Sequence, residues 1–218
     1  MSKHVTEILD YLVEPELLAW MLRTSKAKRE AMSQDSLAIG SYVDLIIQRD
    51  LFPARTTDDL PKPTAIQQVA ITNCVNAWNK FKTDRPDITA CIKDIQVELE
   101  HGDIVGHPDI FYEESTRWGI IDIKTSRTMY PRYWTQTAEY TELKRLADYK
   151  YVDKPRFIAI LRLDKESGLY NYTEIADEAQ IAYEVSVFNA YRMAYDHSFN
   201  SREFIRQQLE MEIIGGLK

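Results

Sequence analysis

The sequence has few cysteines, few glycines and no long apolar run. Its two cysteines, Cys74 and Cys91, belong to no paired motif, so free thiols in a cytoplasmic protein are expected rather than a disulfide scaffold. No stretch of about 18 apolar residues could cross a bilayer. The first twenty residues are interrupted by Glu, Asp and Pro and do not resemble a signal peptide. The excess of 34 acidic over 27 basic residues argues against a protein that coats nucleic acid through bulk charge.

What the sequence does contain is enough apolar material for one sizeable domain over residues 1–218. Helical spacing of apolar residues predicts helices over residues 3–13, 15–32, 36–49, 64–82, 131–149, 177–195 and 200–213. Alternating apolar residues predict strands over residues 90–100, 104–113, 118–125, 156–164 and 169–175. This order predicts an α/β fold in which helices cover a mixed sheet.

Charged residues interrupt two apolar strands in the segment GHPDIFYEESTRWGIIDIKTS, residues 106–126. Asp109 lies within the strand predicted over 104–113, and Asp122 and Lys124 lie within the next. A hairpin would bring the two aspartates together, and Lys124, two residues beyond Asp122, would project to the same face. Two close carboxylates repel unless a cation lies between them, and oxygen ligands select Mg²⁺ or Mn²⁺. The alternative is an Asp–Lys pair on a half-exposed strand.

These residues resemble the core motif of the PD-(D/E)XK nuclease superfamily. Asp109 is followed thirteen positions later by Asp122 and then by Lys124, and residues 136–140 (QTAEY) match the QxxxY motif of the RecB-type, phage-type exonuclease branch. The resemblance covers about residues 36–164 and implies a restriction-endonuclease-like core with helical flanks at 1–35 and 176–218. It implies that Asp109, Asp122 and the Ile123 carbonyl bind one or two metal ions, and that Lys124 faces the attacking water.

Further ligands are implied by the same resemblance. The branch usually has a glutamate on an upstream strand, for which Glu98 is preferred over Glu100. It also tends to have a GxxxH helix, and residues 40–44 (GSYVD) place Asp44 at the ligand position. A helix-surface aspartate is the alternative for Asp44. His107 is expected on the opposite face of its strand from Asp109, as a structural histidine. The iron–sulfur cluster of some relatives needs four cysteines, so none is expected here.

Residues after the strand predicted over 118–125 are candidates for DNA contacts. Gln136 and Tyr140 share one helix face beside that strand. Basic and polar groups there could bind phosphates, and aromatic rings could stack on an unpaired base, with core packing as the alternative for the rings. The remaining candidates are Ser126, Arg127, Arg132, Tyr133 and Trp134. Lys144 and Arg145 are expected on a solvated helix face.

Together these features predict a Mg²⁺- or Mn²⁺-dependent DNA exonuclease acting in phage-type recombination or repair. Two alternatives stay open: a structure-specific or restriction-like endonuclease on the same core, and a module that binds DNA or a protein without cutting. DNA is the expected partner. Two further partners stay open: a single-strand annealing or other recombination protein, and a second copy of the chain. We expect a location in the bacterial or phage-infected host cytoplasm and no membrane association.

Overall fold

The centre of the fold is a five-stranded sheet. The computed structural model describes residues 2–11, 21–55 and 62–215, with side chains up to residue 198 except Arg55. The strand order is β2-β5-β6-β7-β8, formed by Ile92–Ile95, Ile110–Glu113, Trp118–Lys124, Arg156–Leu163 and Tyr170–Ile175. β6 and β7 are parallel and the other neighbours are antiparallel. The predicted mixed sheet is therefore confirmed, as is the hairpin of β7 and β8.

A second, smaller sheet brings the N-terminal segment to the middle of the chain. Its order is β1-β4-β3, formed by Lys3–His4, Ile104–Gly106 and Leu99–His101. β1 runs parallel to β4, with Lys3 opposite Ile104 and His4 opposite Val105. Residues about 100 positions apart in the sequence are thus neighbours.

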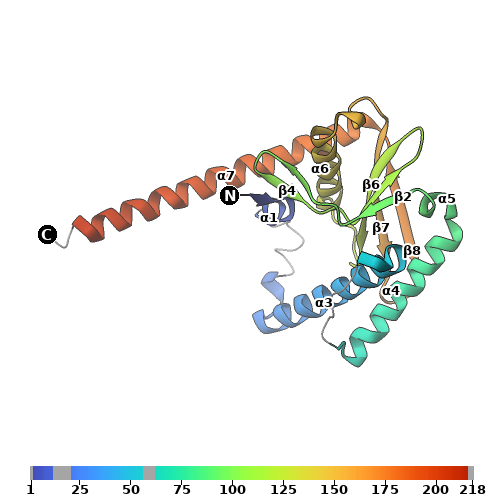
Figure 1. Cartoon of the computed structure of the whole chain (residues 1–218). Coiled ribbons are helices and arrows are strands. Elements are labelled where there is room, and N and C mark those ends of the chain that lie inside the picture. Colours follow the sequence, from blue (N-terminus) through green and yellow to red (C-terminus); the bar gives the residue numbers. More distant parts are fainter. Residues whose placement is uncertain (1, 12–20, 56–61, 216–218) are drawn as a thin grey trace.

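Helices lie on both faces of the five-stranded sheet (Figure 1). α3 (Lys26–Leu51), α4 (Ala65–Asp84) and the short α5 (Pro86–Thr89) cover one face. The other face is covered by α1 (Val5–Asp10), α6 (Arg132–Ala147) and α7 (Glu178–Gly215). Short 3₁₀ turns occupy Pro53–Arg55 and Tyr149–Tyr151. Within the described part of the chain, none of the helices combines the length and hydropathy that crossing a membrane requires.

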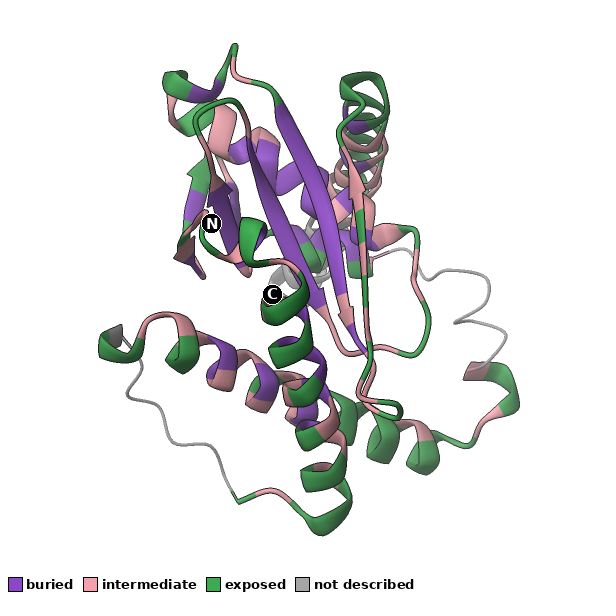
Figure 2. Ribbon diagram, turned by 90° about the vertical axis from the view of Figure 1, so that its right-hand side faces the viewer, coloured by how far each residue is buried: buried purple, intermediate pink, exposed green. Residues whose placement is uncertain are grey.

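The alternation of side chains along β6 fixes which residues face which layer. Ile121 and Ile123 pack with α3 and α4, whereas Trp118 and Ile120 pack with α1 and α6. Figure 2 shows the central strands as buried between the more exposed helices. Asp122 has the same parity as Ile120 and therefore points toward the α6 layer.

α4 shows how local sequence starts a helix. Thr64 Oγ1 accepts a hydrogen bond from the Gln67 N–H at 3.3 Å, and Gln67 Oε1 accepts one from the Thr64 N–H at 2.9 Å. This capping box satisfies two backbone donors at the helix start. The apolar face then buries Ile71, Cys74, Ala77, Trp78 and Phe81. The predicted helix over 64–82 is confirmed.

Two predicted helix breaks do not occur, and an aspartate at each of these positions makes a tertiary contact. α3 continues through residues 33–35, where Asp35 accepts a hydrogen bond from Gln67 of α4 at 2.8 Å. α7 continues through residues 196–199, where Asp196 accepts one from Lys3 at 2.6 Å. The predicted helix over 3–13 begins only at Val5, and parts of the helices predicted over 3–13 and 15–32 lie outside the described residues.

Both long strands predicted before residue 114 are wrong in extent, because each divides between the two sheets. The first separates into β2 and β3 around Gln96, which has a positive φ of 48°. The second separates into β4 and β5 around residues 107–109. Asp109 therefore lies between two strands rather than inside one.

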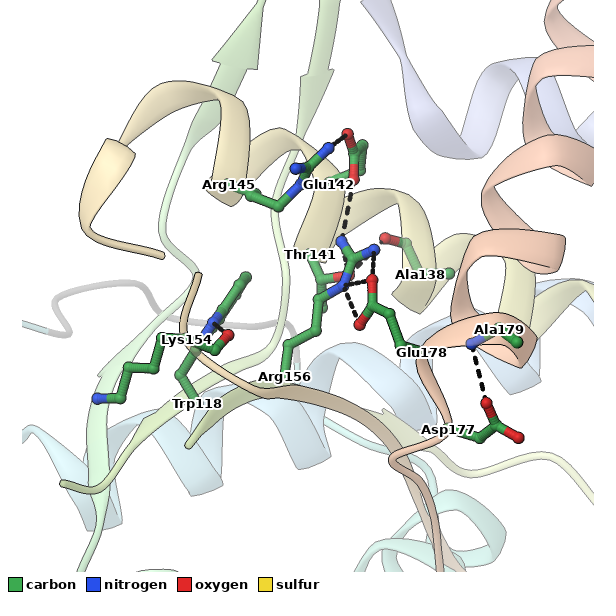
Figure 3. A network of polar contacts seen from close by, with 10 residues as sticks. All are labelled: Trp118, Ala138, Thr141, Glu142, Arg145, Lys154, Arg156, Asp177, Glu178 and Ala179. Carbon is green, nitrogen blue, oxygen red and sulfur yellow. Dashed lines mark hydrogen bonds and ion pairs between the residues drawn. The ribbon is translucent and has the colours of Figure 1, made fainter. Parts of the chain in front are cut away.

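A buried arginine joins three elements at the end of the sheet away from Lys124. Arg156 of β7 donates to Glu142 of α6 at 3.0 Å and to Glu178 of α7 at 2.6 Å (Figure 3). Arg145 donates to the same Glu142. A hollow of about 370 Å³ lies beside this network, lined by residues 151–156 and by Arg145, Ala176 and Glu178. Arg145, Arg156 and Glu178 on its lining are already engaged in this ion-pair network.

Candidate functional site

β6 carries the residues at the centre of the candidate site. Asp122 and Lys124 are two positions apart on this strand, and Asp122 Oδ2 lies 2.7 Å from Lys124 Nζ. The Asp122 side chain is 2% exposed and that of Lys124 is 18% exposed. This ion pair is the contact that the described residues give Asp122 Oδ2, which accepts no further hydrogen bond from them. The charge on the buried Oδ2 of Asp122 is thus compensated by the Lys124 ammonium.

Asp109 is brought to Asp122 by the pairing of β5 with β6. Ile110 lies opposite Ile121, so Asp109, one position earlier, lies beside Asp122. Asp109 also contacts the backbone of β6 directly, since its Oδ2 accepts a hydrogen bond from the Ile123 N–H at 2.7 Å. The two aspartates suggested by the sequence therefore meet at one end of the sheet.

Burial raises the pKa of Asp122 above its usual range. This pKa reaches about 7, with a further contribution from Asp109, and Lys124 opposes the shift. The pKa of Lys124 is also raised: burial lowers it, but the attraction of Asp122 and Asp109 outweighs burial. Burial thus disfavours the ionised form of Asp122, while Lys124 keeps its charge.

A third carboxylate reaches the site from α3. Burial raises the pKa of Asp44 to about 8, with Asp109 and Asp122 adding to the shift and Lys124 opposing it. One turn earlier, a Cβ on Gly40 would lie 3.9 Å from Thr125 Oγ1, so this helix passes close to the end of β6. The GSYVD segment thus places Asp44 in the electrostatic field of the two strand aspartates.

α6 supplies the opposite wall through the two residues of the QxxxY motif. Lys124 Nζ donates to Gln136 Oε1 at 3.2 Å, and Gln136 Nε2 donates to Tyr140 Oη at 2.8 Å. The Tyr140 ring is buried against Gly106, where an added Cβ would lie 2.5 Å from ring carbon Cε1. Lys124 Nζ also lies 4.8 Å from the centroid of the Tyr133 ring. Lysine, amide and phenol therefore form one chain of contacts.

These side chains line a pocket of about 230 Å³ that the N-terminal segment helps to close. Its lining comprises His4, Val5, Thr6, Val105, Gly106, His107, Asp109, Asp122, Lys124, Gln136 and Tyr140. The rings of His4 and His107 are stacked, with centroids 5.9 Å apart. Sequence reasoning missed the contribution of residues 4–6, because only the pairing of β1 with β4 brings them here.

The upstream glutamates do not reach the two aspartates in the described structure. Glu98 is exposed, and its Oε2 lies 3.3 Å from His107 Nε2; Glu100 is exposed on β3. The expected position of His107 is wrong, since it lines the same pocket as Asp109. Side chains two positions apart on an extended chain share a face, so His107 and Asp109 lie on the same side. Gln96, which sequence reasoning did not single out, donates to Asp109 Oδ1 at 2.8 Å.

The candidate DNA contacts after β6 are dispersed. Ser126 donates to the Thr128 carbonyl, and the exposed Arg127 pairs with Glu166. Arg132 Nη1 lies 2.7 Å from Asp10 Oδ1. Trp134 packs with Ala138, Ile158 and Ile181, away from the pocket lining.

Two cations of α6 are less solvated than expected. Lys144 has a 20% exposed side chain and lies over the rings of Phe111 and Tyr151. Arg145 has a 34% exposed side chain and pairs with Glu142.

The donor set fits a hard divalent cation that keeps water ligands. No group of three Asp, Glu, His or Cys residues in the described ranges forms a ready-made cage. Mg²⁺, however, is usually held by one or two carboxylates and retains several waters. Asp109 and Asp122 provide two carboxylates, and Asp122 Oδ2, paired with the Lys124 ammonium, has room to accept a cation as a further partner.

Comparisons with known proteins give remote likenesses to two exonuclease structures. A phage-related exonuclease from Haemophilus somnus 129PT aligns over 93% of this chain and 96% of its own, with 14% identity and a TM-score of 0.36. LHK-Exo, solved in complex with dAMP, aligns over 77% of this chain and 86% of its own, with 16% identity and a TM-score of 0.32. No family model and no curated protein matches the chain. Likenesses this remote transfer no activity to the chain.

Proposed function

We propose that the protein is a Mg²⁺- or Mn²⁺-dependent DNA nuclease that degrades DNA from its ends. The observation that carries the proposal is the buried Asp122, which lies beside a second aspartate and has the Lys124 ammonium 2.7 Å from its Oδ2. A site that only packed or bound DNA would gain nothing from keeping repelling carboxylates, because uncompensated buried charge costs stability.

Asp109 and Asp122, with the Ile123 carbonyl, are the proposed metal ligands, and Asp44 is a further candidate. When bound, the metal supplies Lewis-acid activation of water and stabilises charge on the scissile phosphate. Glu98 is left out of the proposed ligand set because its side chain is exposed and contacts His107.

Lys124 is proposed to act on the water and the phosphate. Its ammonium can orient the attacking water and offset negative charge that develops on the phosphate. Gln136 accepts from Lys124, and Tyr140 accepts from Gln136, so both are expected to hold the ammonium in place as well as to contact the substrate. We expect a displacement of about 1 Å in such a group to reduce the rate roughly 10²-fold.

End-labelled linear DNA and closed circular DNA, each incubated with Mg²⁺ or with EDTA, test the proposal. We expect linear DNA to be degraded only with Mg²⁺, and closed circles to resist. Asp122→Asn is the matched control, because it keeps the shape of the side chain and removes its charge. Circles cut as fast as linear DNA would favour the endonuclease instead.

A metal-dependent stability measurement separates a nuclease from a module that only binds. A metal that binds the folded state alone must raise the melting temperature. We expect Mn²⁺ to stabilise the wild type but not Asp122→Asn. No stabilisation of the wild type, together with intact linear DNA, would contradict the proposed activity.

A further inference from the structure

One residue next to the site has a backbone conformation that its side chain does not favour. Gln96 has a φ of 48° and is the one non-glycine residue with positive φ in the part of the chain that the structure describes. The left-handed region disfavours residues with a Cβ, and glycine adopts it most readily. Strained residues of this kind persist where the surrounding structure holds them, and they are frequent at functional sites.

The conformation of Gln96 serves the transition between the two sheets. Gln96 follows the last residue of β2, and its N–H still donates to the carbonyl of Asp109 at 3.2 Å. The chain then leaves the five-stranded sheet and enters β3 of the small sheet. Glycine would fulfil this backbone role with less strain, so the backbone alone does not explain a glutamine here.

The side chain of Gln96 completes the set of donors around Asp109. Gln96 Nε2 donates to Asp109 Oδ1 at 2.8 Å, while the Ile123 N–H donates to Oδ2 at 2.7 Å. Each oxygen of the Asp109 carboxylate thus has one donor. One donor belongs to the residue after β2, and the other belongs to β6. Two donors fix the plane of the carboxylate, whereas one donor would leave it free to rotate.

A glutamine suits this position for an electrostatic reason. Asp44, Asp109 and Asp122 are three carboxyl groups that already interact with one another and with Lys124. Glutamate has the same length, but when ionised it can only accept, and it would add a further carboxylate. The neutral amide supplies a donor without adding charge.

We propose that Gln96 is a positioning residue that orients Asp109 for metal binding. The inference rests on the proposed function, since it concerns how one of the proposed ligands is held. Gln96 acts through Asp109 and is not itself assigned a contact with metal or DNA. Partners of this kind typically change metal affinity or activity by about 10- to 100-fold when removed.

The test compares Gln96→Gly with Gln96→Ala. Both variants lack the amide, but glycine relieves the backbone strain that alanine retains. Calorimetric titration with Mn²⁺ should show affinity reduced by about 10- to 100-fold in both variants. In urea unfolding without metal, Gln96→Gly should be the more stable of the two. On linear DNA, kcat should fall in both variants with little change in KM.

Gln96→Glu is the second comparison, because it keeps the length of the side chain and loses the donor. We expect its Mn²⁺ affinity at neutral pH to be no better than that of Gln96→Gly. Wild-type Mn²⁺ affinity and kcat in Gln96→Gly would overturn the positioning role, since only the backbone would then matter.

Asp122→Asn separates failure of this inference from failure of the proposed function. If the wild type binds Mn²⁺ and Asp122→Asn does not, the metal site stands and the Gln96 variants are judged on affinity alone, whether or not DNA is cut. Mn²⁺ binding without hydrolysis would overturn the proposed function only. A wild type that takes up no Mn²⁺ would overturn both.

Discussion

Glu139 is a buried carboxyl of α6 outside the pocket lining, and its replacement by glutamine should stabilise the protein at neutral and alkaline pH. The side chain is 6% exposed. Burial raises the pKa of Glu139 to about 8 and Glu142 adds to the shift, while Arg192 of α7 and Arg156 of β7 oppose it. The folded protein therefore retains a proton on Glu139 at pH values where the unfolded chain has lost it.

The sign and size of the effect follow from this pKa. Between pH 4.5 and pH 8 unfolding releases the Glu139 proton, so rising pH lowers the free energy of unfolding by about 1.4 kcal/mol per pH unit. The accumulated loss is on the order of 5 kcal/mol above pH 8, a large share of a typical total of about 5–15 kcal/mol. A glutamine side chain does not ionise, so Glu139→Gln should escape this loss.

Urea unfolding in EDTA at pH 4.5, 6, 7 and 8.5 measures the difference. Wild type and Glu139→Gln should have nearly equal free energies of unfolding at pH 4.5, and the variant should become progressively more stable as pH rises. Equal m-values would show that the compactness of the two states is unchanged.

Glu142→Gln is the matched control with the opposite sign. Burial would raise the pKa of Glu142, but hydrogen bonds from Arg145 and Arg156 outweigh burial and lower it. Its ionised form therefore stabilises the fold above about pH 4.5, and Glu142→Gln should lose stability there and converge with wild type in acid. The reasoning would be refuted if wild type and Glu139→Gln differed in free energy of unfolding by the same amount at pH 4.5 and at pH 8.5.

Three further predictions concern the pocket. Asp122→Asn should abolish hydrolysis and Mn²⁺-induced stabilisation while the metal-free fold stays intact; unchanged cleavage in Mg²⁺ would contradict the proposed metal ligand. Lys124→Ala should reduce the rate by orders of magnitude and retain Mn²⁺ binding in calorimetry, because its ammonium acts on water and phosphate. Tyr140→Phe should keep the ring packed against Gly106, lose the hydroxyl that accepts from Gln136, and degrade end-labelled linear DNA roughly 10²-fold more slowly. Wild-type rates in Tyr140→Phe would show that the ring only packs.

Much of the sheet and its helices could be predicted because the signals are local. The capping box of Thr64 and Gln67 lies within four residues, and the β7–β8 hairpin forms between neighbouring strands. Asp109, just before β5, meets Asp122 of β6 because these strands are consecutive in the sequence and antiparallel. Local pattern is sufficient where the contacts are local.

The rest depends on contacts between distant parts of the chain. The helix breaks predicted at residues 33–35 and 196–199 do not occur, and there Asp35 and Asp196 accept hydrogen bonds from Gln67 and Lys3. A glutamine in the sequence does not indicate a positive φ, so the break between β2 and β3 at Gln96 could not be predicted. The hydrogen bond from Gln96 to Asp109 could not be predicted either.

The position of β1 has a practical consequence for anyone who prepares the protein. Lys3 and His4 are held beside the pocket by pairing with β4, and His4 to Thr6 form part of its wall. An affinity tag fused ahead of residue 1 would emerge next to the pocket that the proposed function assigns to a DNA end. The far end of α7 extends away from the body of the molecule (Figure 1), so purification handles belong at the C-terminus.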